Sequence, residues 1–227
     1  MGPVEVTAFL TDLAREGRVA ASTQNQALSA LLFLYRNILD APLPWLYDVE
    51  RARRPARLPT VLTVSEVQAV LGALPPVHRL PAGLLYGGGL RLMEGLALRV
   101  KDVDFERRQI IVRDAKGFRD RVTVLPDRLA AALRVHLEKV KVVHERDLLA
   151  GYGRVALPFA LERKYPRAGL QWAWQFVFPS STLCQSPVTG AWVRFHVHPT
   201  TVQRAVAQAG RDARIPRPVS PHTFATV

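Results

Sequence analysis

Residues 84–96 read LLYGGGLRLMEGL and are the most informative segment of the sequence. An apolar run ends in three glycines, Arg91 follows, and Glu94 comes three residues later. Glycine permits tight turns close to a ligand, and arginine can bind a phosphate through two parallel hydrogen bonds. No strand precedes the glycines and no Gly-Lys-Ser/Thr ending follows them, which excludes dinucleotide-binding and P-loop motifs. Alone, the pattern fits either a phosphate site or an ordinary structural turn.

The net charge of the chain narrows the class of binding partner. The 227 residues include 31 Lys+Arg and 19 Asp+Glu, a net charge of +12, and 48% are hydrophobic. A globular chain this basic usually binds a polyanion, most often nucleic acid. The alternative is a protein that merely carries excess arginine and binds no polyanion. The single cysteine, Cys184, excludes an internal disulfide framework and a Cys-rich zinc site. We expect no metal, no membrane span, no secretory signal and a cytoplasmic, nucleoid-associated location.

The turn lies in a predicted mixed domain. A capping box at residues 63–66 opens its first helix. Residues 109–112 and 121–125 predict two short strands joined by a polar turn with Lys116 at its tip. A long helix follows Asp127, residues 150–195 read as irregular and aromatic, and residues 200–214 as helical. Lys116 is either a proton donor reaching into a groove or a solvent-facing turn residue.

The N-terminal part is predicted to be helical and to end in a basic linker. Residues 4–39 read as two helices, with Ser22 or Thr23 capping the second. The apolar face of the second helix is predicted to contain Leu28, Leu31, Leu32, Leu34, Tyr35 and Ile38. The linker arginines are Arg51, Arg53, Arg54 and Arg57. They suit contact with phosphates, or they are solvated charges without a partner.

Three motifs together carry a resemblance. Gly89-Leu90-Arg91 with Glu94 is the first, and Lys116 beside Gly117 is the second, although alanine and phenylalanine replace two glycines around it. The third is LPFALERKYPRA at residues 157–168, followed by Trp174. In this order they resemble the tyrosine recombinases, and the integron integrases in particular, over most of the chain.

The resemblance implies an α+β, mainly helical fold. Residues 1–45 would form part of a helical core-binding domain, residues 46–60 a basic linker, and residues 61–227 a mixed catalytic domain. That domain would hold a small antiparallel sheet or hairpin and an insertion at about 150–180. A tyrosine would attack a phosphodiester and leave a phosphotyrosyl link, without a cofactor. Arg91 would hold the phosphate oxygens, Lys116 would protonate the leaving 5′ oxygen, His222 would complete the set, and Glu94 would orient the Arg91 turn or be purely structural.

DNA is the partner that the resemblance implies. It would be a duplex integration site and a folded single-strand cassette hairpin, in a synapse of four protomers. The expected DNA-binding residues are Arg51, Arg53, Arg54, Arg57, Lys101, Arg119, Arg121, Trp172 and Trp174. The aromatic side chains would stack on unpaired bases, or several of them would simply pack the insertion.

One departure bears on activity. The family's C-terminal box reads HTLRHSFAT, whereas residues 222–226 read HTFAT. His222 matches either the first or the second histidine of that box, and Pro221 and Thr223 favour the first. In both alignments the second catalytic arginine is absent. The sequence ends at Val227, and its last tyrosine is Tyr165, inside the insertion. We therefore expect no strand cleavage by this polypeptide. The alternatives are a non-catalytic DNA-binding remnant of an integrase and, from another class, a basic protein–protein adaptor.

Overall fold

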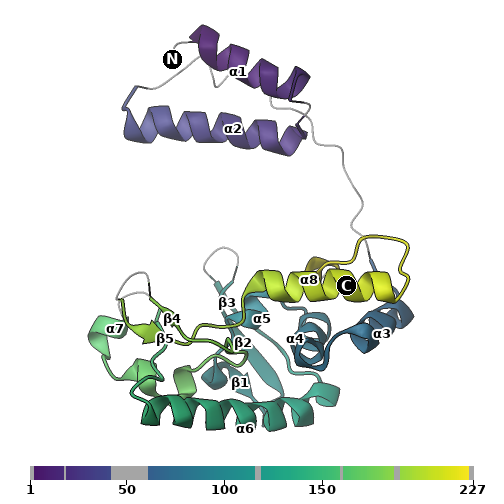
Figure 1. The fold of residues 1–227 in the computed structure, drawn as a ribbon, viewed down its shortest axis with the longest axis vertical. Coiled ribbons are helices and arrows are strands. Elements are labelled where there is room, and N and C mark those ends of the chain that lie inside the picture. Colours follow the sequence, from purple (N-terminus) through teal and green to yellow (C-terminus); the bar gives the residue numbers. More distant parts are fainter. Residues whose placement is uncertain are drawn as a thin grey trace. The chain divides into compact units, whose positions relative to one another are not determined.

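A computed structural model describes residues 3–17, 19–41, 61–115, 119–158, 161–186 and 190–224 (Figure 1). The chain divides into two compact units, residues 1–58 and 59–227. Each unit has its own apolar core.

The smaller unit is a pair of helices, α1 (Pro3–Arg15) and α2 (Ala21–Phe33). Val6 and Leu10 of α1 and Leu28 of α2 are buried against one another. The two helices predicted between residues 4 and 39 are confirmed.

Two details predicted for the second helix are wrong. It begins at Ala21, and its N-cap residue, Ala20, makes no side-chain cap bond, so neither Ser22 nor Thr23 is the cap. The buried face is also shorter than predicted, because Leu34 and Ile38 are 40% and 64% exposed. The reason is a π-helical turn over Leu34–Ile38, whose wider i→i+5 bonding departs from the α-helical period on which the predicted face relied.

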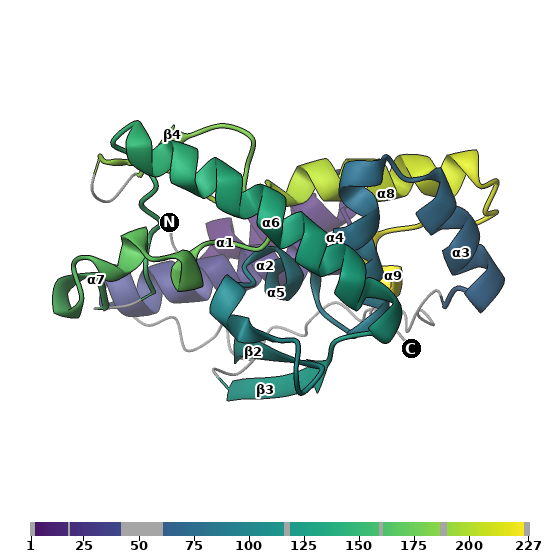
Figure 2. The ribbon, with the colours of Figure 1, turned by 90° about the horizontal axis from the view of Figure 1, so that it is seen from below.

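The larger unit is built around α4 (Pro76–Gly87), whose Leu84 and Leu85 are fully buried. Helices α6 (Asp127–Leu149) and α8 (Pro199–Asp212) lie on its two sides (Figures 1 and 2). Three further helices pack on this layer: α3 (Val64–Ala73), α5 (Leu92–Leu96) and α9 (Pro221–Phe224). The residues around the glycine turn therefore rest on a well-packed core.

The predicted capping box is confirmed at the start of α3. The Glu66 backbone amide donates to Thr63 Oγ1 at 3.3 Å, and the Thr63 amide donates to Glu66 Oε2 at 2.8 Å. These reciprocal bonds satisfy two amides that the first helical turn leaves unpaired.

A three-stranded antiparallel sheet in the order β1-β2-β3 lies beside α5. Its strands are β1 (Val103–Asp104), β2 (Gln109–Ala115) and β3 (Arg119–Val124). Ile111 pairs with Val122 and Val112 with Arg121, and the register then shifts before Ala115 pairs with Arg119. The predicted hairpin is confirmed, but its strands are longer on the turn side than predicted, because β2 continues to Ala115 and β3 begins at Arg119.

The described residues between 150 and 195 contain only short elements, as predicted. They are α7 (Leu161–Lys164), 3₁₀ turns at Ala168–Leu170 and Trp172–Trp174, and the paired strands β4 (Cys184–Gln185) and β5 (Trp192–Val193). With so little regular structure, this segment depends on side-chain contacts to hold its shape.

A buried ion pair supplies one such contact. Arg194 Nε and Nη2 donate to the two carboxylate oxygens of Asp147 on α6 at 2.6 and 2.9 Å, and Arg194 Nη1 donates to the Ser180 carbonyl at 2.7 Å. Both side chains are below 10% exposed. The pair ties the last turn of α6 to the irregular segment.

We predict that Asp147→Ala lowers the free energy of unfolding by about 3–5 kcal/mol, because it leaves the Arg194 guanidinium buried without its counter-charge. The double variant Asp147→Leu/Arg194→Met should lose less, since no buried charge remains. Urea unfolding of the three proteins measures both effects. A double variant less stable than the single variant would contradict this account.

Candidate active site

The glycine turn at residues 87–89 is held by sterics and by backbone geometry. Gly89 has φ +58°, a left-handed conformation that glycine adopts at little cost. A Cβ on Gly87 would lie 2.6 Å from Pro126 Cγ, and one on Gly88 would lie 2.9 Å from the Leu84 carbonyl oxygen. The end of α4 therefore turns tightly against the start of α6, and the chain emerges at Arg91, directly before α5.

Glu94 binds the residue that this turn presents. Its Oε2 accepts from the Arg91 backbone amide at 2.9 Å, and its Oε1 accepts from Arg91 Nη1 at 2.7 Å. The Arg91 side chain is 53% exposed, whereas the Glu94 side chain is only 9% exposed. The buried Glu94 carboxylate thus binds one nitrogen of the Arg91 guanidinium, while much of the Arg91 side chain remains exposed to solvent.

Arg121 joins β3 to the same carboxylate. Its Nη2 donates to Glu94 Oε2 at 2.7 Å and to the Gly89 carbonyl at 3.0 Å. The Thr123 hydroxyl, also on β3, donates to the Gly88 carbonyl at 2.7 Å. The hairpin and the glycine turn are therefore one connected unit, although 27 residues separate Glu94 from Arg121.

These contacts set the charge state of Glu94. Burial alone would raise its pKa, but hydrogen bonds from the Arg91 amide and from the Arg121 and Arg91 guanidinium groups outweigh burial and lower the pKa. Glu94 is thus ionised at neutral pH, and two cations share one anion.

Several expected residues lie outside the described part of the chain. They are Lys116 at the hairpin tip and the linker residues Arg51, Arg53, Arg54 and Arg57. Arg119 begins β3, and only its backbone is described.

His222 lies near the start of α5. It is an exposed residue of α9, and it lines one pocket together with Leu92, the residue that follows Arg91. Gln203 of α8 and Ser220 line the same pocket. The fold thus brings the C-terminal segment to the start of α5.

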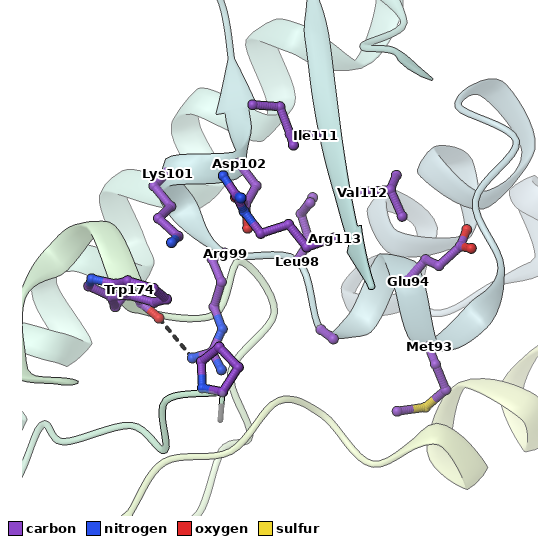
Figure 3. A pocket seen from close by; sticks show the side chains of 12 residues that line it. Met93, Glu94, Leu98, Arg99, Lys101, Asp102, Ile111, Val112, Arg113 and Trp174 are labelled. Carbon is purple, nitrogen blue, oxygen red and sulfur yellow. Dashed lines mark hydrogen bonds and ion pairs between the residues drawn. The ribbon is translucent and has the colours of Figure 1, made fainter. Parts of the chain in front are cut away.

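A second cationic site adjoins Glu94 (Figure 3). Lys101 Nζ lies 3.0 Å from the centroid of the Trp174 ring, a cation–π contact. Arg113 Nε donates to the buried Asp102 carboxylate at 2.6 Å. The pocket lined by these four side chains, Met93 and Pro158 combines positive charge with an aromatic face.

Arg99 holds the wall of this pocket, and the sequence interpretation did not single it out. Its Nη1 and Nη2 donate to the carbonyls of Trp174 and Ala156 at 2.8 and 2.9 Å, and its guanidinium lies 3.7 Å from the centroid of the Phe176 ring. Burial lowers the Arg99 pKa to about 10, against the opposing effect of Asp102. Arg99 stays charged at neutral pH. Its sequence signal is its place in residues 98–104, LRVKDVD, which also resemble tyrosine recombinase sequence.

The two predicted tryptophans have different surroundings. Trp174 lines the pocket with Lys101 and a second pocket with Tyr165 and Arg167. Trp172 instead packs against the core, with its ring centroid 6.0 Å from that of His144. Both are partly buried, and Trp174 is the one that lines these two pockets.

Two kinds of feature are absent from the described ranges. No group of three or more His, Cys, Asp or Glu side chains there is arranged to hold a metal ion. No helix there is both long and apolar enough to cross a membrane.

Sequence comparison finds two family models. One described as "Phage integrase family" matches residues 60–225, and one described as "Phage integrase, N-terminal SAM-like domain" matches residues 1–45. Two relatives named "Integrase/recombinase", from Escherichia coli and Pseudomonas aeruginosa, are each 49% identical over 224 residues. The match covers 99% of this chain and 66% of the length of each relative.

Solved structures share the fold. XerH recombinase bound to difH substrate matches with a TM-score of 0.60 at 17% identity, over 99% of this chain and 57% of that one. A lambda integrase tetramer bound to a Holliday junction matches with a TM-score of 0.59 at 14% identity, over 100% of this chain and 58% of that one.

We predict that Glu94→Gln lowers the free energy of unfolding at neutral pH by about 1.5–3 kcal/mol, the range for hydrogen bonds to charged groups. Because folding lowers the Glu94 pKa, its ionised form contributes stability above the unfolded-state pKa of about 4.3. That contribution is lost as the pH falls through the lower folded-state value. Urea unfolding across this pH range should therefore show the two proteins converging in acid.

The control is Glu138→Gln, an exposed glutamate on α6, whose effect should stay small because surface charges contribute little. A difference between wild type and Glu94→Gln that grows as the pH falls would contradict the assignment.

Proposed function

The chain belongs to the phage integrase family of tyrosine recombinases, and from that premise we propose that it binds DNA at a site-specific recombination site. The observation that carries the proposal is the half-exposed Arg91 guanidinium, presented by a glycine turn and held from behind by Glu94. A fixed, outward-facing guanidinium is suited to a DNA phosphate, which it can bind with two parallel hydrogen bonds.

Around that phosphate we propose distinct roles. Arg91 holds the non-bridging oxygens, where negative charge builds during phosphoryl transfer. Lys116, which follows the last described residue of β2, protonates the leaving oxygen in a complete enzyme, and His222 assists from the C-terminal segment. The contact between β3 and the glycine turn supports this grouping, because it brings the hairpin to Arg91.

A finer proposal concerns the form of the DNA. Trp174 lies between two pockets that also contain Lys101, Tyr165 and Arg167. An aromatic face beside cations suits an unpaired base and its phosphate. We propose that this region takes bases that protrude from a folded single-strand hairpin, as in integron cassette recombination, and that the basic linker contacts phosphates on a duplex arm.

The C-terminal segment favours binding without cleavage. Residues 222–226 read HTFAT, so the second arginine of the family's C-terminal box is absent, whichever histidine of that box His222 matches. Two guanidinium groups stabilise the same transition-state charge in the family, and one cannot replace both. We propose that this polypeptide is a DNA-binding form of an integrase, and that the synapse of a complete enzyme contains four copies.

The binding proposal is tested with Trp174→Ala. We predict that its affinity for a hairpin with an unpaired base falls roughly 5- to 150-fold, the equivalent of one lost base stack. Its affinity for a fully paired duplex should change little, and both affinities should fall steeply with added salt. Fluorescence anisotropy over a salt series measures all of these.

Trp192→Ala is the matched control, because Trp192 is a 48% exposed tryptophan on β5 that lines neither pocket. Equal losses in the two variants would remove the base-stacking role of Trp174. Salt-independent binding, or none, would remove the DNA-binding proposal and favour a protein adaptor.

The cleavage proposal has its own test. We predict that a suicide substrate, nicked so that a cleaved strand cannot be religated, yields no covalent adduct with this polypeptide on a denaturing gel. A family member with both arginines and the tyrosine serves as the positive control. A trapped adduct would show that the chemistry survives the altered C-terminal segment.

A further inference from the structure

Arg121 was expected to contact DNA, but its contacts assign it another task. Nη2 carries two hydrogens, and the structure directs this nitrogen to two acceptors inside the chain, the Gly89 carbonyl and Glu94 Oε2. The Arg121 side chain is 36% exposed, less than that of Arg91. Arg121 is therefore hydrogen-bonded to the glycine turn, and its side chain is less exposed to solvent than that of Arg91.

The charges at this point do not cancel. Arg91 and Arg121 each contribute one positive charge, and Glu94 contributes one negative charge between them, with both contacts at 2.7 Å. Without Arg121, Arg91 and Glu94 would form a neutral pair. A neutral Arg91–Glu94 pair would attract a phosphate only weakly. When Arg121 also pairs with Glu94, the three groups keep a net positive charge, so Arg91 attracts a phosphate more strongly.

We propose that Arg121 is a positioning residue that neutralises Glu94, so that Glu94 holds Arg91 in place without cancelling the positive charge that Arg91 offers to a phosphate. The inference rests on the proposed phosphate-binding role of Arg91. The proposal also connects two parts of the site, because Arg121 on β3 sets the effective charge at Arg91, next to the glycine turn.

The alternative is a purely structural Arg121 that only closes the turn through the Gly89 carbonyl. The two roles differ in what a second substitution does. If Arg121 acts through charge, neutralising Glu94 as well should restore the field at Arg91. If Arg121 acts only as a brace, removing a second contact from the turn should leave binding as weak or weaker.

The experiment follows the Arg91 Nε–H resonance by NMR, assigned with Arg91→Lys, while inorganic phosphate is added to the full chain. Sodium chloride at matched ionic strength controls for general screening. We expect Arg121→Gln to weaken phosphate binding at Arg91 by about tenfold, the effect of roughly 1.4 kcal/mol. Arg121→Gln/Glu94→Gln should return the affinity to within about twofold of wild type.

Two further variants sharpen the result. Arg121→Lys keeps the charge but loses the forked donor, so it should bind phosphate nearly as well as wild type. Arg121→Lys also keeps the test decisive if Arg121→Gln fails to fold. If Arg121 is purely structural and needs both nitrogens of its guanidinium, Arg121→Lys should bind phosphate more weakly than wild type. Arg107→Gln is the charge control: Arg107 pairs with Asp104 and makes no contact with Glu94, so it should have little effect.

Three outcomes would overturn the proposal. They are unchanged phosphate affinity in Arg121→Gln, a double variant as weak as the single variant, and the absence of any phosphate-specific shift at Arg91 in wild type. No DNA enters this measurement. A chain that fails the salt-series test with DNA but shows the rescue pattern would refute the proposed function and leave this inference standing, and the reverse pattern would refute only this inference.

Discussion

In the larger unit, the link between the glycine turn and the hairpin depends on one carboxylate. Glu94 is almost fully enclosed and accepts hydrogen bonds from a backbone amide and two guanidinium groups, which come from the glycine turn and from β3. A carboxylate in that position would be unfavourable without its cations. With them, it joins segments that are distant in the sequence and holds the exposed Arg91 in one orientation. The apolar helices around α4 provide the rigid support, since Gly95 of α5 packs so closely on Leu85 that an added Cβ would lie 2.7 Å from Leu85 Cδ2.

The irregular segment after α6 is held in place in a different way. Its described residues form few regular backbone hydrogen bonds, and buried arginine side chains hold it instead. Arg99 bonds the carbonyls of Ala156 and Trp174, and Arg194 binds Asp147 and the Ser180 carbonyl. Both arginines are fixed by their own partners, so they are structural groups within a basic chain. Lys101 and Arg167 instead line pockets beside Trp174, and they are the cations that we propose for ligand binding.

The sequence predicted the features that depend on neighbouring residues. The capping box at Thr63, the hairpin strands and the long helix after Asp127 follow from patterns a few residues in length, and the structure confirms them. The family resemblance located Arg91 and Glu94. The role of Arg121 was not predictable, because its partner is 27 residues away and only the register of β3 brings the two together. The same limit applies to Trp172 and Trp174, which are alike in local sequence, yet one packs on the core and the other borders a pocket.

The contacts of Arg99 have a consequence for how this segment can change over time. Its guanidinium binds main-chain oxygens at residues 156 and 174, and every amino acid offers such an oxygen at those places. Substitution at either position leaves the hydrogen-bonding groups intact. The side chains that we propose for ligand binding are therefore uncoupled from these two attachments. Ligand preference can diverge among descendants of this chain while the segment stays docked in the same way.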